Sequence, residues 1–123
     1  MKTILFLVLL CNFCFAQTKQ DITKPSGAQK TLRSENCKDV AIYAQMDIDN
    51  NNISLFLKGG IAPIIYKTDT AFESIYKLKF DDLGCIGNKC AEQYNQYIFD
   101  YLNKTYGKKW IKDIRKEVLG FKK

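Results

Sequence analysis

The sequence predicts an α+β fold: a small antiparallel sheet of about three to four strands, followed by two C-terminal helices. Two observations predict it. Between about residues 40 and 80, apolar and polar residues alternate, as in strands that bury one face. After Cys90, apolar residues recur every three or four positions, as on one face of a helix. Because no internal repeat and no second apolar region follow, we expect a single domain over residues 37–123.

Residues 1–16 have the features of a secretory signal peptide. Lys2 precedes an apolar run at residues 4–10, and Cys14 and Ala16 place small residues before a cleavage point after Ala16. The run is too short to span a bilayer as a helix, and no second long apolar run follows. The sequence therefore predicts a secreted or periplasmic protein without a transmembrane segment.

Residues 17–36 predict a flexible polar leader. Their large apolar residues are Ile22 and Leu32, and the turn-forming residues Pro25, Ser26 and Gly27 lie between them. Such a segment buries too little apolar surface to offset the conformational entropy lost on ordering. We therefore expect the folded domain to begin near Cys37.

The first two strands are predicted as a β-hairpin. Residues 40–48 alternate between apolar and polar side chains, and so do residues 53–57. The Asp-Asn-Asn-Asn run at residues 49–52 supplies turn chemistry between them.

Three shorter elements are predicted before the cysteine-containing loop. Residues 61–66, IAPIIY, predict a third strand, which Pro63 would place at an edge or a bulge. Residues 69–76 predict a short helix. Residues 77–80 alternate again and predict one more short strand.

Two helices are predicted at the C-terminal end. The first begins after Cys90 and ends at Gly107, a residue typical of helix C-termini. The second runs from about Lys108 to Gly120.

Cleavage of the signal peptide would leave three of the five cysteines: Cys37, Cys85 and Cys90. An odd number of thiols in an oxidising compartment predicts one disulfide and one free thiol. We predict a Cys85–Cys90 bridge across the Gly-Asn turn, with Cys37 as the alternative partner of either cysteine. The chain contains no histidine, so the cysteines do not predict a zinc site, and the spacing differs from the CxxC of redox sites. No metal or other cofactor is predicted.

Other motifs give little indication of catalysis. The stretch that starts at Asp47 resembles the opening of a calcium loop, but Asn52 replaces the required glycine and Lys58 the required glutamate. The absence of histidine removes the usual base of serine and cysteine hydrolases. Thr70 and Asn103 lie in short patterns that fit glycosylation acceptors, and their modification is left open.

The last twenty residues are strongly basic. They contain eight lysines and arginines, against Asp113 and Glu117. A basic face on the second C-terminal helix is predicted to be the candidate binding surface, formed by Lys108, Lys112, Arg115, Lys116 and Trp110. In the alternative interpretation the apolar side of the helix packs on the sheet, Trp110 lies in the core and the lysines are only solvated.

The C-terminal region resembles a group of small secreted bacterial proteins of unknown function. These share a Gly-Cys loop, a Tyr-Asn helix and a C-terminal Tyr-Gly-Lys-Lys-Trp helix. The matching positions are Gly84, Cys85, Tyr94, Asn95, Tyr106, Gly107, Trp110, Arg115, Val118 and Gly120. The resemblance covers roughly the C-terminal third of the chain and implies export and a helical C-terminus, without an activity.

These observations predict an exported, small, non-enzymatic binding protein. Its partner would be an acidic protein or an anionic envelope surface, and export argues against nucleic acid. One alternative is a small secreted hydrolase or toxin-like effector. Another is an inhibitor of a secreted enzyme, in which the loop at residues 86–89 would enter a cleft.

Overall fold

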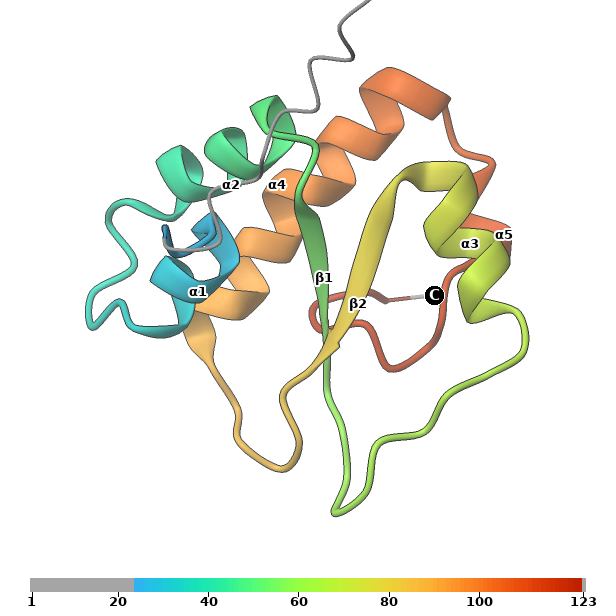
Figure 1. Cartoon of the computed structure of the whole chain (residues 1–123), viewed down its shortest axis with the longest axis horizontal. Coiled ribbons are helices and arrows are strands. Elements are labelled where there is room, and N and C mark those ends of the chain that lie inside the picture. The colour runs from blue at the N-terminus through green and yellow to red at the C-terminus, as the bar shows by residue number, and fades with distance from the viewer. Residues whose placement is uncertain (1–23, 123) are drawn as a thin grey trace, which may run out of the picture.

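Two short parallel strands lie between helices in the computed structural model of the chain, which describes residues 24–122 (Figure 1). Strand β1 (Ile53–Leu57) and strand β2 (Leu78–Asp82) pair from Ile53↔Leu78 to Leu57↔Asp82. Helix α3 (Asp69–Tyr76) connects them, so that β1, α3 and β2 form a β-α-β unit. Because the strands are parallel, their carboxyl ends lie at the same end of the sheet, the lower end in Figure 1.

Three helices pack together on one side of the strands. They are α1 (Gly27–Leu32), α2 (Val40–Asp49) and the long α4 (Lys89–Tyr106), which also contacts β1. Helix α3 lies next to β2 at the other side of the strands (Figure 1), whereas the short α5 (Trp110–Asp113) packs on α4 through Trp110 and Phe99. The core between these layers contains the largest fully buried side chains, among them Trp110, Tyr94, Phe56, Leu55 and Ile98.

The outer edge of β1 is covered by side chains of α4 and by the C-terminal segment. The Asn95 side chain accepts a hydrogen bond from Phe56 N at 2.9 Å and donates to Phe56 O and Leu119 O, both at 2.9 Å. Leu57 forms an isolated antiparallel bridge with Val118. The edge of β1 is therefore satisfied without a third strand.

Helix α1 is anchored by a buried carboxylate. Asp47 of α2 accepts hydrogen bonds from the backbone N–H groups of Gly27 and Ala28 and from the Tyr94 hydroxyl, each at 2.7 Å. Position 27 must be glycine, because a Cβ atom there would collide with the Tyr43 carbonyl of α2. Through these three hydrogen bonds Asp47 links α1, α2 and α4. A carboxylate is also favourable beside the N-terminus of a helix such as α1.

The α+β class is confirmed, but the predicted architecture is wrong. The described residues contain one sheet of two parallel strands and five helices, instead of three to four antiparallel strands followed by two helices. The predictions at 53–57, 69–76 and 77–80 correspond to β1, α3 and β2. The first C-terminal helix ends at Gly107 as predicted, in α4.

The predicted strand at residues 40–48 is helix α2. Val40 and Ala44 are buried four positions apart, whereas Ile42 between them is exposed. A segment with apolar residues at every second position also has them at every fourth position. The same sequence therefore fits a helix with one buried face. The hairpin turn predicted at residues 49–52 is instead the connection from α2 to β1.

The predicted third strand at residues 61–66 is an exposed loop. The outer edge of β1 is occupied by the Asn95 side chain, and on β2 the Phe80 N–H donates to Glu73 Oε1. Part of the predicted leader is also wrong. Residues 27–32 form α1, and Ala28 and Thr31 are buried in the fold. The predicted signal peptide and residues 17–23 lie outside the described residues.

The second C-terminal helix is much shorter than predicted. Helix α5 ends at Asp113, and Ile114 adopts extended backbone, after which the chain runs alongside β1. Lys58 N donates to Glu117 O, and Leu119 N donates to Phe56 O. The backbone partners offered by the edge of β1 explain why the chain leaves the helical conformation here.

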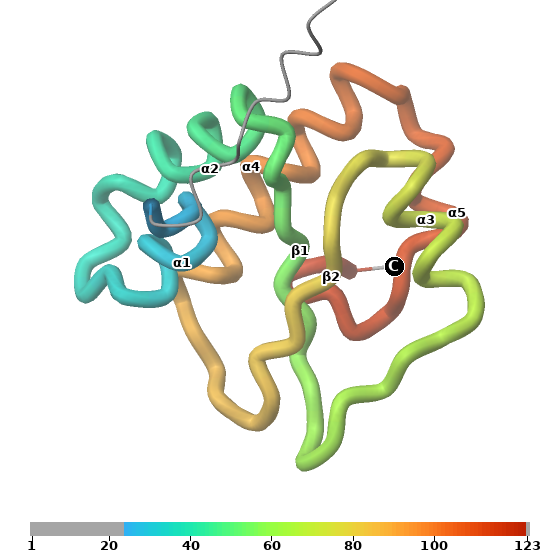
Figure 2. The backbone as a smooth tube through the Cα atoms, in the orientation of Figure 1, coloured from blue at the N-terminus to red at the C-terminus, as the bar shows by residue number. Residues whose placement is uncertain are grey.

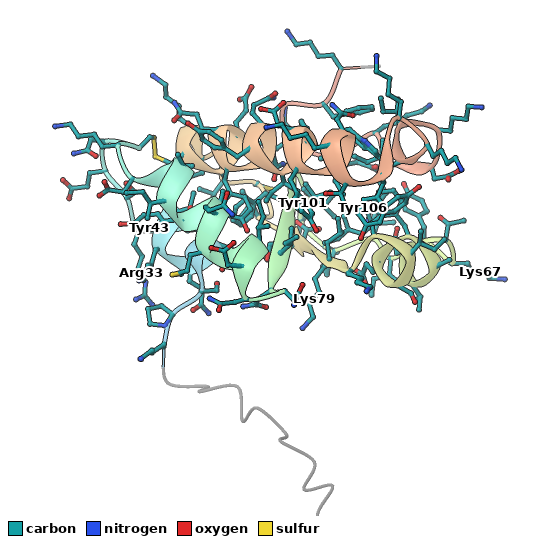
Figure 3. All side chains as sticks on the ribbon, turned by 90° about the horizontal axis from the view of Figure 1, so that it is seen from above. Arg33, Tyr43, Lys67, Lys79, Tyr101 and Tyr106 are labelled. Carbon is teal, nitrogen blue, oxygen red and sulfur yellow. A yellow bond between two sulfur atoms is a disulfide. The ribbon has the colours of Figure 1, made fainter. Side chains whose placement is uncertain are left out.

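The disulfide joins Cys37 to Cys90, and Cys85 is a free, exposed thiol. The predicted Cys85–Cys90 bridge is therefore wrong, and the alternative partner, Cys37, is the correct one for Cys90. The bridge ties the beginning of α4 to the segment before α2, where Figure 3 shows it as a yellow bond. None of the helices in residues 24–122 is long and apolar enough to cross a membrane.

Candidate binding surface

Two loops leave the carboxyl ends of the strands and lie next to each other. Residues 58–68 connect β1 to α3, and residues 83–88 connect β2 to α4. Gly59 N donates to Gly84 O at 3.1 Å, and Leu83 N donates to Leu57 O at 3.1 Å. Figure 2 shows both loops at the lower end of the molecule.

These loops expose large aliphatic side chains to solvent. The exposed fractions are 101% for Ile61, 57% for Ile64, 85% for Ile65 and 76% for Ile86. We call these four isoleucines the loop surface. Burying one such side chain is worth about 1.5–3 kcal/mol, so leaving four of them in water gives up stability that the core would gain. Large apolar side chains exposed on two loops that adjoin at their bases indicate an interaction site.

The backbone of the first loop is held by a buried arginine. Arg115 Nη1 donates to the carbonyl of Ile64 and to Asp69 Oδ2, both at 3.0 Å. The same Asp69 oxygen accepts from Tyr66 N at 2.9 Å. The side chains of Arg115 and Asp69 are each 8% exposed, so this ion pair is largely shielded from water. The loop therefore presents its isoleucines from a defined backbone.

Tyr66 adds a second attachment. Its ring lies 4.5 Å from the Arg115 guanidinium carbon, and its hydroxyl donates to Glu117 Oε1 at 2.7 Å. The hydrogen bond between them raises the pKa of the Tyr66 hydroxyl and lowers the pKa of the Glu117 carboxyl. A binding loop that is ordered before binding loses less entropy in the complex.

The base of the two loops is a tight junction around Asp82. Asp82 Oδ1 accepts from Gly84 N at 2.7 Å, and Gly84 adopts a positive φ of 64°. A Cβ atom at Gly59 would collide with the Asp82 carboxylate, so glycine allows the close approach. Burial, reinforced by the charge of Asp82, raises the pKa of the neighbouring Asp81 carboxyl.

Lysines accompany the isoleucines. Lys58 and Lys67 flank the first loop, and Lys89 follows Ile86 by three positions; all three are exposed. No acidic residue occurs in residues 58–68 or 83–89. Lys67 projects at the end of the molecule far from Arg33 and Tyr43 (Figure 3). The two loops are thus apolar at their tips, where the loop surface lies, and positively charged at their borders.

The predicted basic helical face does not exist as one surface. Trp110 is 2% exposed, packs against the rings of Phe99 and Phe121, and donates from Nε1 to Asn103 Oδ1. The alternative interpretation of Trp110 as a core residue is therefore correct. Arg115 is buried under the first loop. Lys108, Lys112 and Lys116 are exposed, but the helix ends at Asp113, before Lys116.

Residues 61–65 were not predicted to be part of a site. Their apolar character predicted a strand, although the preceding Gly-Gly and the internal Pro63 are signals of a loop. Residues 86–89 were proposed as a loop that could enter a cleft. Ile86, Gly87 and Lys89 are exposed, and Asn88 caps α4 by accepting from Ala91 N.

Two surface depressions lie away from the loop surface. One, of about 550 Å³, follows the outer face of α2 and is lined by Ala41, Ile42, Gln45, Met46, Asp49 and Asn50. The other, of about 430 Å³, is lined by residues around the amino ends of both strands and includes Glu73 as its carboxylate. Each contains a single carboxylate, so neither provides the acid–base pair of a glycosidase.

Comparisons with protein-family models, curated proteins and solved structures find no match. The assignment of function therefore rests on the physical chemistry of this chain.

Proposed function

We propose that the protein is a binding protein of an oxidising compartment outside the cytoplasm, and that it contacts its partner through the loop surface. The observation that supports this most directly is the exposure of Ile61, Ile64, Ile65 and Ile86 on two adjoining loops, the first of which is held at Ile64 O by Arg115.

The arrangement of charges around Arg115 supports a role in positioning. A buried ion pair is seldom the most stable solution, because desolvation of the two charges offsets their attraction. Here Asp69 Oδ1 and Arg115 Nε have no hydrogen-bond partner, although both are buried. The pair nevertheless holds Ile64 O and Tyr66 N, the backbone atoms that define the first loop. We infer that this ion pair serves to fix the backbone conformation of the first loop.

The compartment is supported by the Cys37–Cys90 disulfide, which is compatible with an extracellular or periplasmic protein. The proposal includes export of the chain and removal of a signal peptide by cleavage after Ala16. Inhibition of a secreted enzyme is a special case of it, in which the same loops would enter the cleft of the enzyme.

The proposal is tested by binding to an envelope fraction from the producing cells. Purified protein is sedimented with the fraction, and the parent is compared with Ile61→Ser/Ile65→Ser. The matched control is Ile42→Ser/Ile75→Ser, which changes two isoleucines on α2 and α3 that are 66% and 59% exposed. We expect the loop variant to lose most of the binding and the control variant to keep it. Equal binding by both variants would overturn the proposal.

A further inference from the structure

We infer that the partner of the loop surface is an anionic lipid bilayer, into which the four isoleucines insert while the bordering lysines contact lipid phosphates. The inference rests on the proposed function and names the class of its partner.

The distribution of charge is the first argument. Apolar side chains occupy the loop tips, and Lys58, Lys67 and Lys89 stand at the borders, with no carboxylate in either segment. A bilayer with anionic lipids has the complementary order, with negative charge at the surface and hydrocarbon beneath it. Long lysine side chains can keep their ammonium groups at the headgroup level while neighbouring apolar groups enter the bilayer.

The carboxylates nearest the loops are engaged within the fold. Asp69 pairs with Arg115, and Glu117 accepts from the Tyr66 hydroxyl. Asp82 accepts from Gly84 N. Asp81 lies near the end of β2, is partly buried and is paired with Phe56 of β1. Asp81 and Asp82 weaken the local positive potential, but both precede the exposed part of the second loop.

The type of side chain is the second argument. Energetic centres of protein–protein interfaces are enriched in Trp, Tyr and Arg. The side chains exposed at the loop tips are aliphatic, with Tyr66 as the aromatic residue at their border. Ile61 is fully exposed, so it has no supporting contact within the protein. Aliphatic side chains that project freely suit a fluid hydrocarbon phase, which needs no shape complementarity.

Tyr66 lies where an interfacial aromatic residue is expected. It follows Ile65 directly, is 42% exposed, and is bound through its hydroxyl to Glu117. Tyr and Trp are enriched at the boundary between hydrocarbon and headgroups, because one part of the ring system is apolar and the other polar.

The test uses protein-free vesicles and a sedimentation assay. Vesicles of phosphatidylcholine with one quarter phosphatidylglycerol are compared with vesicles of phosphatidylcholine alone. All variants are produced in the same exporting host and compared at the same N-terminus, verified by intact mass, because the apolar run at residues 4–10 would itself bind lipid if retained. We expect the parent to bind the anionic vesicles and to dissociate as salt is added.

Two pairs of variants separate the apolar and the electrostatic contributions. Ile61→Ser/Ile65→Ser should weaken binding at least tenfold, and Ile42→Ser/Ile75→Ser should leave it unchanged. Replacing Lys58, Lys67 and Lys89 by glutamine should weaken binding roughly tenfold to a hundredfold and reduce its salt dependence. The matched control replaces three exposed lysines elsewhere, Lys38, Lys79 and Lys104, and should bind more tightly than the loop-lysine variant.

The outcomes distinguish the inference from the proposed function. If the loop isoleucines are required for binding to the envelope fraction but protein-free vesicles are not bound, the partner is a protein and the lipid inference is overturned. If vesicle binding does not distinguish Ile61→Ser/Ile65→Ser from Ile42→Ser/Ile75→Ser, the inference is likewise overturned. If neither assay depends on the loop isoleucines, both the inference and the proposed function fail.

Discussion

Asn95 shows how one side chain replaces a strand. Its amide group has the same donor and acceptor as a peptide unit, and it pairs with both backbone groups of Phe56 on the outer edge of β1. A two-stranded sheet leaves such an edge unpaired, and unpaired backbone groups are costly when buried. The Tyr-Asn pair in α4 is therefore structural, with Tyr94 bound to Asp47 and Asn95 bound to β1.

Replacing Asn95 by aspartate should destabilise the fold strongly. The new oxygen would face the carbonyls of Phe56 and Leu119, which now accept from Asn95 Nδ2. Each buried group left without a partner costs about 1–3 kcal/mol, and repulsion adds to this. Urea unfolding measures the loss. Gln93→Glu, at an exposed position of the same helix, is the control, and a comparable loss in both variants would contradict the role given to Asn95.

Arg115 and Lys116 are adjacent in sequence but should respond differently to replacement by glutamine. Arg115→Gln leaves the Asp69 carboxylate buried without its partner, and breaking such a pair costs about 3–5 kcal/mol. Lys116 is exposed, so Lys116→Gln should change stability by less than about 0.5 kcal/mol. Thermal unfolding compares the two variants. Similar stability would show that Arg115 does not hold the loop.

Asp81 gives the fold a pH dependence of known sign. Its pKa is raised by burial and by Asp82, so the folded state binds the proton more tightly than the unfolded state does. The ionised carboxylate therefore destabilises the fold at neutral pH, and this penalty declines as the pH falls through the raised pKa towards the ordinary value of 3.8.

Asp81→Asn should consequently be more stable than the parent at pH 7, by up to about 1 kcal/mol because the group is partly solvated. The advantage should shrink in acid and vanish below about pH 3.8. Urea unfolding at a series of pH values measures it. Asp100→Asn, at an exposed position of α4, is the control. An advantage for Asp81→Asn that persists at low pH would show that ionisation is not its cause.

At the level of elements, α5 depends on one side chain. Four residues are too few for a helix to be stable by itself. Trp110 lies in this helix, stacked on Phe99 at a ring distance of 5.4 Å, and attaches it to α4. Its position explains why the basic C-terminal residues do not form a free amphipathic helix.

Trp110→Ala should cost about 3–5 kcal/mol, since it removes a large buried side chain. Tyr97→Ala is the control, because Tyr97 is an exposed aromatic residue of α4, the helix on which Trp110 packs. Thermal unfolding monitored by circular dichroism provides the measurement. A small effect of Trp110→Ala, together with loss of partner binding, would restore the surface role predicted from the sequence.

At the level of the whole molecule, the disulfide closes a loop of the chain that contains α2, β1, α3 and β2. Cys37 and Cys90 are 53 residues apart, and cross-linking a loop of this length stabilises the fold by about 4 kcal/mol in the chain-entropy model. Cys37→Ala/Cys90→Ala should lose about this amount. Cys85→Ser should be neutral, because Cys85 is exposed and free. Urea unfolding distinguishes them, and a large loss in Cys85→Ser would contradict the observed pairing.

The sequence by itself predicted those elements whose signals lie within a few residues. The alternating residues 53–57, the end of a helix at Gly107 and the odd number of thiols could be interpreted locally. The direction of strand pairing, the cysteine partner and the burial of Trp110 depend on which distant segments meet. The type of element at residues 40–49 also depends on tertiary packing. Apolar residues at every second position fit a strand, but they also fit a helix that buries every fourth residue. Only the packing shows that Ile42 is exposed.

The loop surface was decided by tertiary structure for the same reason. Isoleucines close together in the sequence are expected to be buried where the edge of a sheet or an apolar face of the core is free to pack against them. Here Asn95 and the C-terminal segment occupy the free edge of β1, and Arg115, which is remote in sequence, holds Ile64 O in the loop. The isoleucines remain in solvent because the edge of β1 offers no free partner for a third strand, and Glu73 accepts from Phe80 N on the edge of β2.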